Sequence, residues 1–272
     1  MDESVRRASA GLRSLTAARV SLPMSGHSVA TTEVLDFQLA HAQARDAVHA
    51  ALDGEGFARR LNQELPLLAE LGVDVLALGT RAKDRASYLR HPQAGRSLDA
   101  ESAAMLQATP CDLAITIADG LSALAVERNA IPLLAVLLPQ LVEQAWTLGP
   151  VTVVEQGRVG VCDAIGEGLG AQCSLMLIGE RPGLSAADSM GAYLTWEPRV
   201  GRTDAERNCL SNIRDGGLSV EEAAARLIWL LRMAREMRET GVRLKEGAFP
   251  AGGLKPAAGA GDAGGVGAIG GA

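Results

Sequence analysis

Short apolar runs alternate with helical segments from residue 73 onward, and this alternation limits the folds open to the chain more than any other feature. Several runs are apolar throughout, as is typical of strands covered on both faces of a sheet. The candidate strands are Val73–Leu78, Leu113–Ala118, Leu133–Leu137, Val151–Val154, Ser174–Ile178 and Ala192–Trp196. The helical segments among and after them are Ala123–Arg128, Gln140–Trp146 and Ser219–Thr240. Strands and helices in alternation predict an α/β fold with a mainly parallel sheet flanked by helices.

Two segments of this pattern differ in how clearly they are marked. Leu133–Leu137 is ambiguous, because a buried helix is as continuously apolar as a buried strand. The last helix begins instead with a capping box, Ser219-x-x-Glu222, in which each side chain accepts from the other residue's backbone N–H. The stripe that this helix should bury consists of Val220, Ala224, Leu227, Leu231 and Ala234.

The chain before the first strand reads as helical. Thr31 or Thr32 can cap a helix that runs to about Leu52, and a second helix is predicted over Phe57–Leu71 with Gly72 as its stop. The stripe expected to be buried in the first helix consists of Val34, Phe37, Ala44, Val48 and Leu52. His41 lies in the same stripe, and we expect a partly buried packing residue there, not a ligand.

These patterns divide the chain into three parts. Residues 1–72 form a helical N-terminal region, residues 73–247 form the sheet domain, and residues 248–272 form a tail. The tail is dominated by Gly and Ala and has few groups to bury, so it is predicted to be disordered.

Composition and charge exclude several classes of protein. Hydrophobic residues make up 47% of the chain, which is enough for a buried core. The net charge of −6 and the small aromatic content, three Trp, two Tyr and three Phe, argue against a nucleic-acid partner. The longest apolar run, Ile131–Leu138, contains one proline and is followed by another, so no membrane span is expected. The charged start of the chain lacks the apolar segment of a signal peptide, and we expect a soluble intracellular protein.

Cysteine and histidine patterns point to no metal centre. The cysteines are not spaced as Cys-x-x-Cys, and we expect reduced thiols at Cys111, Cys162, Cys173 and Cys209. The histidines show no metal-ligand spacing with them, so a structural zinc site is not expected.

Three segments occupy positions where parallel sheets bind ligands, beyond the carboxyl ends of strands. They are Ala118–Ser122, Gly179–Gly183, and Arg207–Ile213 with Gly216-Gly217 after it. Each segment also has a purely structural interpretation. Asp119 or Ser122 can cap the next helix. Glu180 and Arg181 can form a surface ion pair, and Cys209 can be a core thiol.

One glycine motif is a false lead for a dinucleotide site. Gly166-x-Gly168-x-x-Ala171 matches a loose fingerprint, but it precedes a strand instead of following one. We therefore predict a short helix over Asp163–Gly170. No recognisable pattern marks a nucleophile, a base and an orienting acid, so the candidate site is expected to bind and not to react.

Several blocks of sequence, in order along the chain, resemble the small (light) subunit of ethanolamine ammonia-lyase. The resemblance extends from about residue 12 to residue 241. Its blocks are Leu12–Val20, Leu35–His41, Tyr88–Arg96, Asp119–Ser122, Gly157–Val159, Gly179–Gly183 and Cys209–Gly217.

This resemblance implies a function in ethanolamine catabolism. The family enzyme converts ethanolamine to acetaldehyde and ammonia with a radical that adenosylcobalamin supplies through cobalt–carbon homolysis. The large subunit carries the substrate-binding barrel, and the small subunit's Rossmann-like domain holds the cobalamin against it. The family also implies higher-order assembly of large–small subunit pairs. Its cofactor keeps its own benzimidazole on cobalt (base-on), which agrees with the absence of an Asp-x-His-x-x-Gly motif here.

The family's cobalamin contacts map onto Val159, Glu180 and Cys209 by local match. Val159 and Cys209 would offer packing and backbone polar groups, and Glu180 would accept hydrogen bonds from amides or hydroxyls of the cofactor. None of the three is expected to act as an acid or a base, and no catalytic or metal-binding residue is predicted.

One departure from the family affects the expected localisation. Some relatives carry a long extension, linked to packaging in a bacterial microcompartment, where this sequence has eleven residues before Leu12. We expect a cytoplasmic enzyme and keep packaging as an alternative. A self-contained α/β enzyme and a non-catalytic scaffold of the same pathway are the rival functions.

Overall fold

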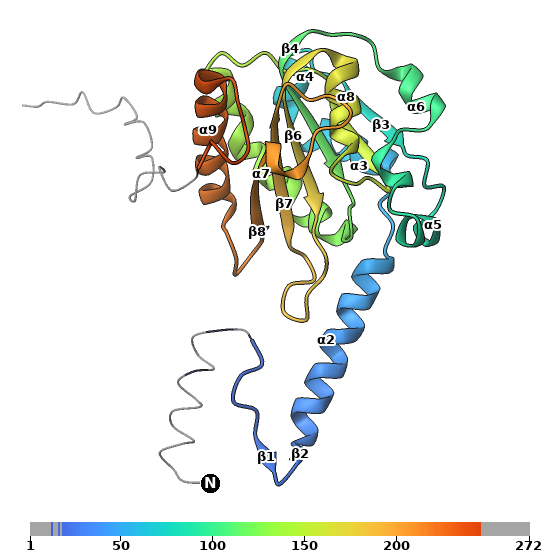
Figure 1. Ribbon diagram of the computed structural model, residues 1–272, viewed down its shortest axis with the longest axis vertical. Helices are drawn as coiled ribbons and strands as arrows, with labels where there is room; N and C mark the ends of the chain where they lie inside the picture. Colours follow the sequence, from blue (N-terminus) through green and yellow to red (C-terminus); the bar gives the residue numbers. More distant parts are fainter. Residues whose placement is uncertain (1–11, 13–15, 17, 246–272) are drawn as a thin grey trace, which may run out of the picture.

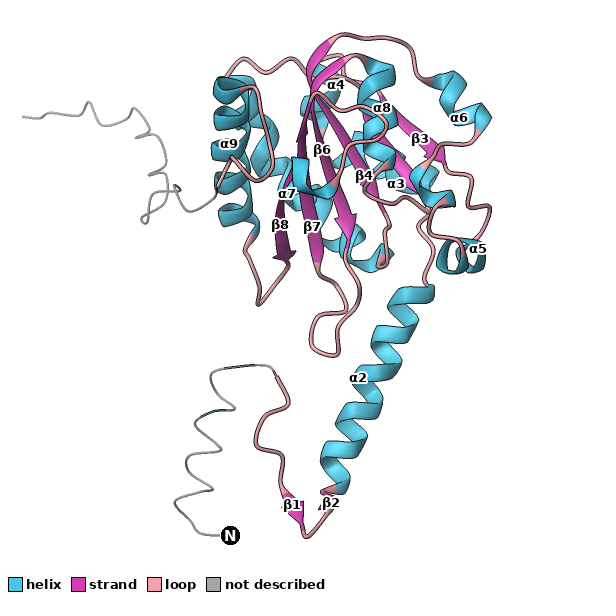
Figure 2. Ribbon diagram, in the orientation of Figure 1, coloured by secondary structure: helices cyan, strands magenta, loops and turns pink. Residues whose placement is uncertain are grey.

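The computed structural model describes Leu12, Thr16 and residues 18–245, and its centre is one six-stranded sheet with helices on both faces (Figures 1 and 2). The strands are β3 (Val75–Gly79), β4 (Cys111–Ala118), β5 (Val151–Glu155), β6 (Ala171–Gly179), β7 (Met190–Trp196) and β8 (Arg207–Ile213). Their spatial order is β3-β5-β4-β6-β7-β8. The first four run parallel, and β7 pairs antiparallel with both β6 and β8, so that β8 runs in the direction of the first four. The predicted α/β fold with a mainly parallel sheet is confirmed.

Helices cover the two faces of this sheet unequally. One face packs against α3 (Gly54–Glu64), α4 (Pro66–Glu70), α7 (Ala123–Glu143) and α9 (Val220–Met237) in the larger core cluster. The other face packs against α8 (Val161–Leu169) in a smaller cluster. The shorter helical elements are α5 (Arg85–Arg90), η1 (Ala94–Arg96), α6 (Ala100–Met105) and η2 (Asp204–Glu206). We call the face of the sheet that packs against α8 the α8 face.

The apolar run at residues 133–137 is the middle of helix α7, so its strand alternative is wrong and its helical alternative is confirmed. The helix predicted at Ala123–Arg128 and the first part of that predicted at Gln140–Trp146 belong to the same helix, which continues through Pro132 and Pro139 and ends at Glu143. Ser122 starts it by accepting a hydrogen bond from the N–H of Ala125 at 3.2 Å. Burial of most of its apolar surface outweighs the backbone bonds that the prolines remove.

Helix α7 also bears on the prediction that no segment spans a membrane. Within the described residues it is long and apolar enough to span one by length and composition. However, it packs against the sheet and against α9, and more than half of its most apolar stretch is buried. A core helix of a globular domain has these properties.

Strand β8 corrects the interpretation of residues 207–213, which we predicted as a segment beyond a strand end. These residues are themselves an edge strand that pairs antiparallel with β7. Arg207 and Cys209 lie on the α8 face, opposite Thr195 and Tyr193. The sequence of β8 is mostly polar, because part of this edge strand faces solvent, and a search for apolar runs therefore misses it.

Helix α2 (Thr31–His49) projects away from the sheet, and the short hairpin of β1 (Met24–Ser25) and β2 (Ser28–Val29) lies at its far end (Figure 1). The predicted buried stripe is wrong in its first half, where Val34 and Phe37 are 40% and 44% exposed. His41 is exposed and stacks on Phe37, so it is not a partly buried residue. The buried residues are Ala40, Ala44 and Ala47, because the second half of α2 is the part that reaches the sheet domain, whereas the first half contacts Arg19. The helix follows Ala30, and neither threonine is the cap.

The remaining helix predictions hold with adjusted bounds. The helix predicted over Phe57–Leu71 is divided at Pro66 into α3 and α4, and Gly72 follows with a φ of +68°. The predicted Asp163–Gly170 helix is α8, which ends at a left-handed Gly170. Ser219 caps α9 by accepting from the N–H of Glu222. The predicted tail at residues 248–272 lies outside the described residues.

Candidate functional site

The carboxyl ends of β4 and β5 form the point where the chain changes direction across the sheet. The connection after β4 runs through α7 on one face, and the connection after β5 runs through α8 on the other. Adjacent strands whose connections leave on opposite faces open a crevice between their carboxyl ends, and ligands bind there in open α/β sheets. Here the crevice lies between the Asp119-Gly120 turn and the segment Gln156–Val159.

The side chain of Arg85, on α5, fills the inner part of this crevice and ties three segments together. Its Nη1 donates to Asp119 Oδ2 at 3.2 Å, to the carbonyl of Gly120 at 2.8 Å and to Gln156 Oε1 at 3.2 Å. Its Nε donates to the carbonyl of Val48, at the end of α2, at 2.6 Å. The Arg85 side chain is 9% exposed, and its Nη2 is buried without a hydrogen-bond partner.

Asp119 is the acid that holds this arginine, and it is fully buried. Its Oδ1 accepts from the N–H of Gly157 at 3.1 Å, so one carboxylate joins the loops after β4 and β5. Burial raises the pKa of Asp119 to about 6, although Arg85 and backbone hydrogen bonds oppose that shift. The alternative in which Asp119 caps the next helix is wrong, because Ser122 is the cap.

A stack of three side chains extends outward from Arg85. The ring of Tyr88 is fully buried and its hydroxyl donates to the carbonyl of Gly157 at 2.9 Å. The guanidinium carbons of Arg85 and Arg158 lie 4.9 Å and 4.4 Å from the ring centroid. Both distances are within the range of cation–π attraction. Neither Arg85 nor Tyr88 was predicted as a site residue: no local motif marks Arg85, and Tyr88 entered only as the start of the Tyr88–Arg96 block.

Glu180 follows β6 and braces the turn between β6 and β7. Its Oε2 accepts from the hydroxyl of Ser189 and from the N–H of Asn212, the latter at 3.1 Å. No ion pair joins Glu180 to Arg181 in the part of the chain that the structure describes, so that alternative is wrong. Gly179, just before it, packs closely on the loop after β4. A Cβ there would lie 2.0 Å from the carbonyl oxygen of Ser122.

Cys209 lies on the α8 face of edge strand β8 and is exposed, so its interpretation as a core thiol is wrong. Its Sγ is 3.4 Å from Ser211 Oγ, and it stands opposite Tyr193. Val159, partly buried, packs into the same α8-face cluster as Tyr193. Burial, with Cys209 and Glu180 nearby, raises the pKa of Tyr193. Tyr193 thus lies among the predicted contacts, on the surface they share.

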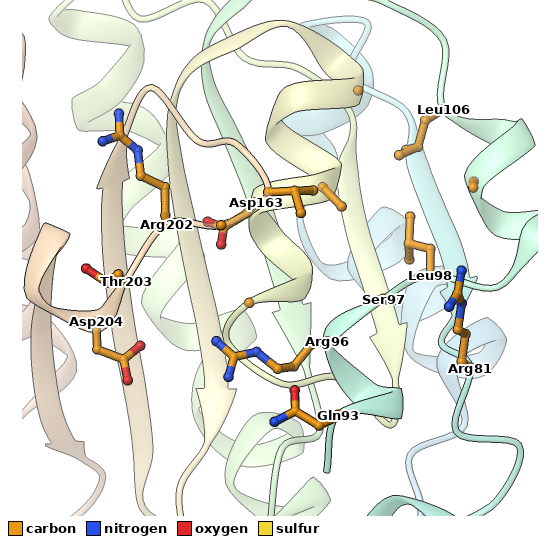
Figure 3. Close-up of a pocket in the computed structure, with 16 residues that line it drawn as sticks. Arg81, Gln93, Arg96, Ser97, Leu98, Leu106, Asp163, Arg202, Thr203 and Asp204 are labelled. Atoms are coloured by element: carbon orange, nitrogen blue, oxygen red, sulfur yellow. The ribbon is translucent and has the colours of Figure 1, made fainter. Parts of the chain in front are cut away.

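Two cavities adjoin this region. One, of about 510 Å³, lies between the second half of α2, Arg158 and the turn at residues 181–184. A second, of about 1060 Å³, lies over α8, with Arg81 and Leu98 on one side and Arg202 and Asp204 on the other (Figure 3). Val159, Glu180 and Cys209 do not line the second cavity. Its floor includes Asp163. The two carboxylate oxygens of Asp163 accept hydrogen bonds from Nη1 and Nη2 of the buried Arg207, at 2.7 and 2.6 Å.

Comparison with known proteins decides the family. The family model for the ethanolamine ammonia-lyase light chain (EutC) matches residues 6–245. The chain belongs to the ethanolamine ammonia-lyase small-subunit family. It is therefore a subunit of a carbon–nitrogen lyase of ethanolamine degradation.

Individual small subunits of ethanolamine ammonia-lyase align over most of their length. Those of Pseudomonas putida (strain W619) and Azotobacter vinelandii (strain DJ / ATCC BAA-1303) are 50% and 49% identical over 243 residues, or 87% of each chain. That of Pseudomonas syringae pv. tomato is 51% identical, over 87% of this chain and 82% of its own. The resemblance carried by the ordered sequence blocks is confirmed.

The described part of this small subunit holds no group of three or more His, Cys, Asp and Glu that could bind a metal ion. The cysteines form no disulfide, and three of them are buried. Asp119, the acid with the raised pKa, is fully buried beneath Arg85 and not presented to a ligand.

Proposed function

We propose that this small subunit binds adenosylcobalamin on the carboxyl edge and α8 face of its sheet and holds it against the large subunit. The observation that carries the proposal is the grouping of three features on one side of the sheet. The switch-point crevice and the Glu180 turn follow the neighbouring strands β5, β4 and β6, and the exposed Cys209 lies on the α8 face of β8, with β7 between β6 and β8. Family membership supplies the identity of the enzyme, and the sequence resemblance supplies the cofactor.

The residues present fit a large, amide-bearing cofactor. Glu180 uses Oε2 for its hydrogen bonds within the chain and has Oε1 available on a partly exposed side chain. A carboxylate accepts from the primary amides that surround a corrin ring. Val159 and Cys209 add apolar and soft contacts beside it, and the 510 Å³ cavity adjoins the same turn.

When bound, adenosylcobalamin supplies radical chemistry that amino-acid side chains lack. The residues of this chain bind and orient it, and the Arg85–Asp119 pair keeps the loops beneath it in position. We place the cofactor in its base-on form. His41 lines the nearby cavity, but it lacks the Asp-x-His-x-x-Gly context in which histidine replaces the cofactor's base.

The partner in this proposal is the large subunit, and pairs of large and small subunits assemble further. The first half of α2 presents Val34, Leu35, Phe37 and Leu39 to solvent, and exposed apolar clusters of this kind mark interaction surfaces. We place the assembled enzyme in the cytoplasm, with packaging in a microcompartment as the alternative.

Reconstitution tests the function directly. Ethanolamine turnover should require this chain, the large subunit and adenosylcobalamin together, and full activity of the large subunit without this chain would refute the proposal. Turnover by this chain alone would favour a self-contained enzyme.

Substitution of Glu180 separates cofactor binding from a scaffold role. Glu180→Ala should weaken corrinoid binding about tenfold or more in equilibrium dialysis, while gel filtration still shows the large–small complex. Glu101→Ala, an exposed site on α6, is the matched control. Unchanged affinity in Glu180→Ala would favour the scaffold or place the contact elsewhere.

A further inference from the structure

The 510 Å³ cavity between α2 and the Glu180 turn concentrates positive charge. Three arginines and a histidine line it, from three separate segments: His41 and Arg45 on α2, Arg158 after β5, and Arg181 after β6. Its other lining residues are apolar or glycine, and no acid is among them. The chain as a whole carries a net charge of −6, so the positive charge of this cavity is opposite in sign to the net charge of the protein.

The cations of this cavity are poorly neutralised within the described residues. Arg158 stacks on Tyr88, but its Nε is buried without a hydrogen-bond partner. Arg181 is exposed and forms none of the ion pairs of the described chain, and Arg45 pairs with Asp46 only at an exposed site. A buried guanidinium donor without an acceptor costs free energy unless a ligand supplies one.

Arg85 adds a further positive charge on the far side of Tyr88. Burial and the nearby charge of Arg158 both lower the pKa of Arg85, while Asp119 opposes them. The one acid in this stack, Asp119, is engaged by Arg85 and by the N–H of Gly157. Positive charge is thus in excess on the outer side, where the cavity opens.

We propose that Arg45, Arg158 and Arg181 bind a phosphate group in this cavity, and that in the assembled enzyme this group is the phosphodiester of the cofactor's nucleotide loop. The identity of that source rests on the function proposed above. Arginine forks match phosphate oxygens, and a tetrahedral anion accepts from several directions at once. A carboxylate is planar and can be satisfied by one arginine fork, whereas these three arginines approach from three segments.

The test compares the binding of a corrinoid that contains the phosphodiester, a corrinoid that lacks it, and inorganic phosphate alone. The purified large–small complex is dialysed to equilibrium against adenosylcobalamin, against adenosylcobinamide, which lacks the nucleotide loop, and against radiolabelled inorganic phosphate. The variants are Arg158→Gln and Arg181→Gln, the second of which removes an exposed side chain and leaves the Tyr88 stack intact. Arg199→Gln, at an exposed site outside the cavity, is the control.

Each cavity variant should lower adenosylcobalamin affinity about tenfold, equivalent to about 1.4 kcal/mol, and leave adenosylcobinamide affinity within about twofold. Equal losses for both corrinoids, or no loss for either, would overturn the phosphate site while leaving the cofactor function standing. If the complex binds neither corrinoid, but binds inorganic phosphate saturably and the variants abolish that binding, the cofactor function fails and a phosphate site for another ligand remains. If the complex binds neither corrinoid nor inorganic phosphate, both the phosphate site and the cofactor function are overturned.

Discussion

The Nη1 of Arg85 lies 3.2 Å from the carboxylate of Asp119, a residue with no exposed surface. The two residues are 34 positions apart and come from α5 and the loop after β4. Their pairing fills the inner part of the crevice at the carboxyl ends of β4 and β5 and joins the two loops there, the second of which leads to Val159.

Replacing Arg85 should destabilise the fold strongly. Arg85→Met leaves the buried carboxylate of Asp119 without its cation, and we expect a loss of about 3–5 kcal/mol in the free energy of unfolding. Urea denaturation measures it. Arg59→Met, which removes an exposed pair with Glu55, is the control and should cost less than about 1 kcal/mol. Equal effects of the two substitutions would contradict the role given to Arg85.

Asp119 should make stability depend on pH in an unusual direction. Its pKa of about 6 in the folded protein lies above its ordinary value of 3.8, so folding favours the protonated acid. The stabilisation that Asp119 adds to the free energy of unfolding is fully present below about pH 4 and is lost as the pH rises to about 6. Above that pH the free energy of unfolding no longer changes through this residue. The change should be on the order of 3 kcal/mol.

Asp119→Asn isolates this effect because the amide does not titrate. Between pH 4 and 6, the free energy of unfolding of the wild type should fall relative to that of the variant, as measured by urea denaturation at each pH. Parallel pH profiles for the two proteins would show that Asp119 does not titrate in this window.

Gly179 should be intolerant of a side chain. In Gly179→Ala the new Cβ would lie 2.0 Å from the carbonyl oxygen of Ser122, so the loops after β4 and β6 must separate. We expect a loss of about 3 kcal/mol or more, at the upper end for overpacking. Gly183→Ala is the matched control, since its nearest atom would be at 3.9 Å. A thermal melt of Gly179→Ala that matches this control would refute the close approach.

Cysteine labelling should find one reactive thiol. Cys209 is exposed, whereas burial raises the pKa of Cys162 to about 12 and also raises that of Cys111 and Cys173. The thiolate is the reactive species, so iodoacetamide should modify Cys209 first, as peptide mass spectrometry would show. Denatured protein should be modified at every cysteine.

The same reaction reports on the proposed cofactor contact. In the large–small complex, adenosylcobalamin should slow the labelling of Cys209, and a Cys209→Ser variant should show no fast phase. Labelling of Cys209 at the same rate with and without bound cofactor would move the contact away from this residue.

Much of the fold was predictable because local sequence encodes it. The runs that became β3, β4, β5, β6 and β7 are mostly apolar, and Ser219 and Gly72 carry a local helix start signal and a helix stop signal respectively. Helix α7 and strand β8 were misjudged for opposite reasons. The middle of α7 is so apolar that no polar periodicity marks it as a helix, and an edge strand open to solvent needs no continuous apolar run.

The sequence by itself determined the family, the α/β class and the turn that contains Glu180, because ordered motifs and apolar periodicity are local properties of the chain. Only the tertiary structure decided that Arg85 occupies the switch-point crevice, that Tyr88 stacks between two arginines, and that Cys209 is exposed. Arg85 meets partners 34 to 71 positions away. Such contacts arise from the order in which strands pair, and no pattern within one segment records that order.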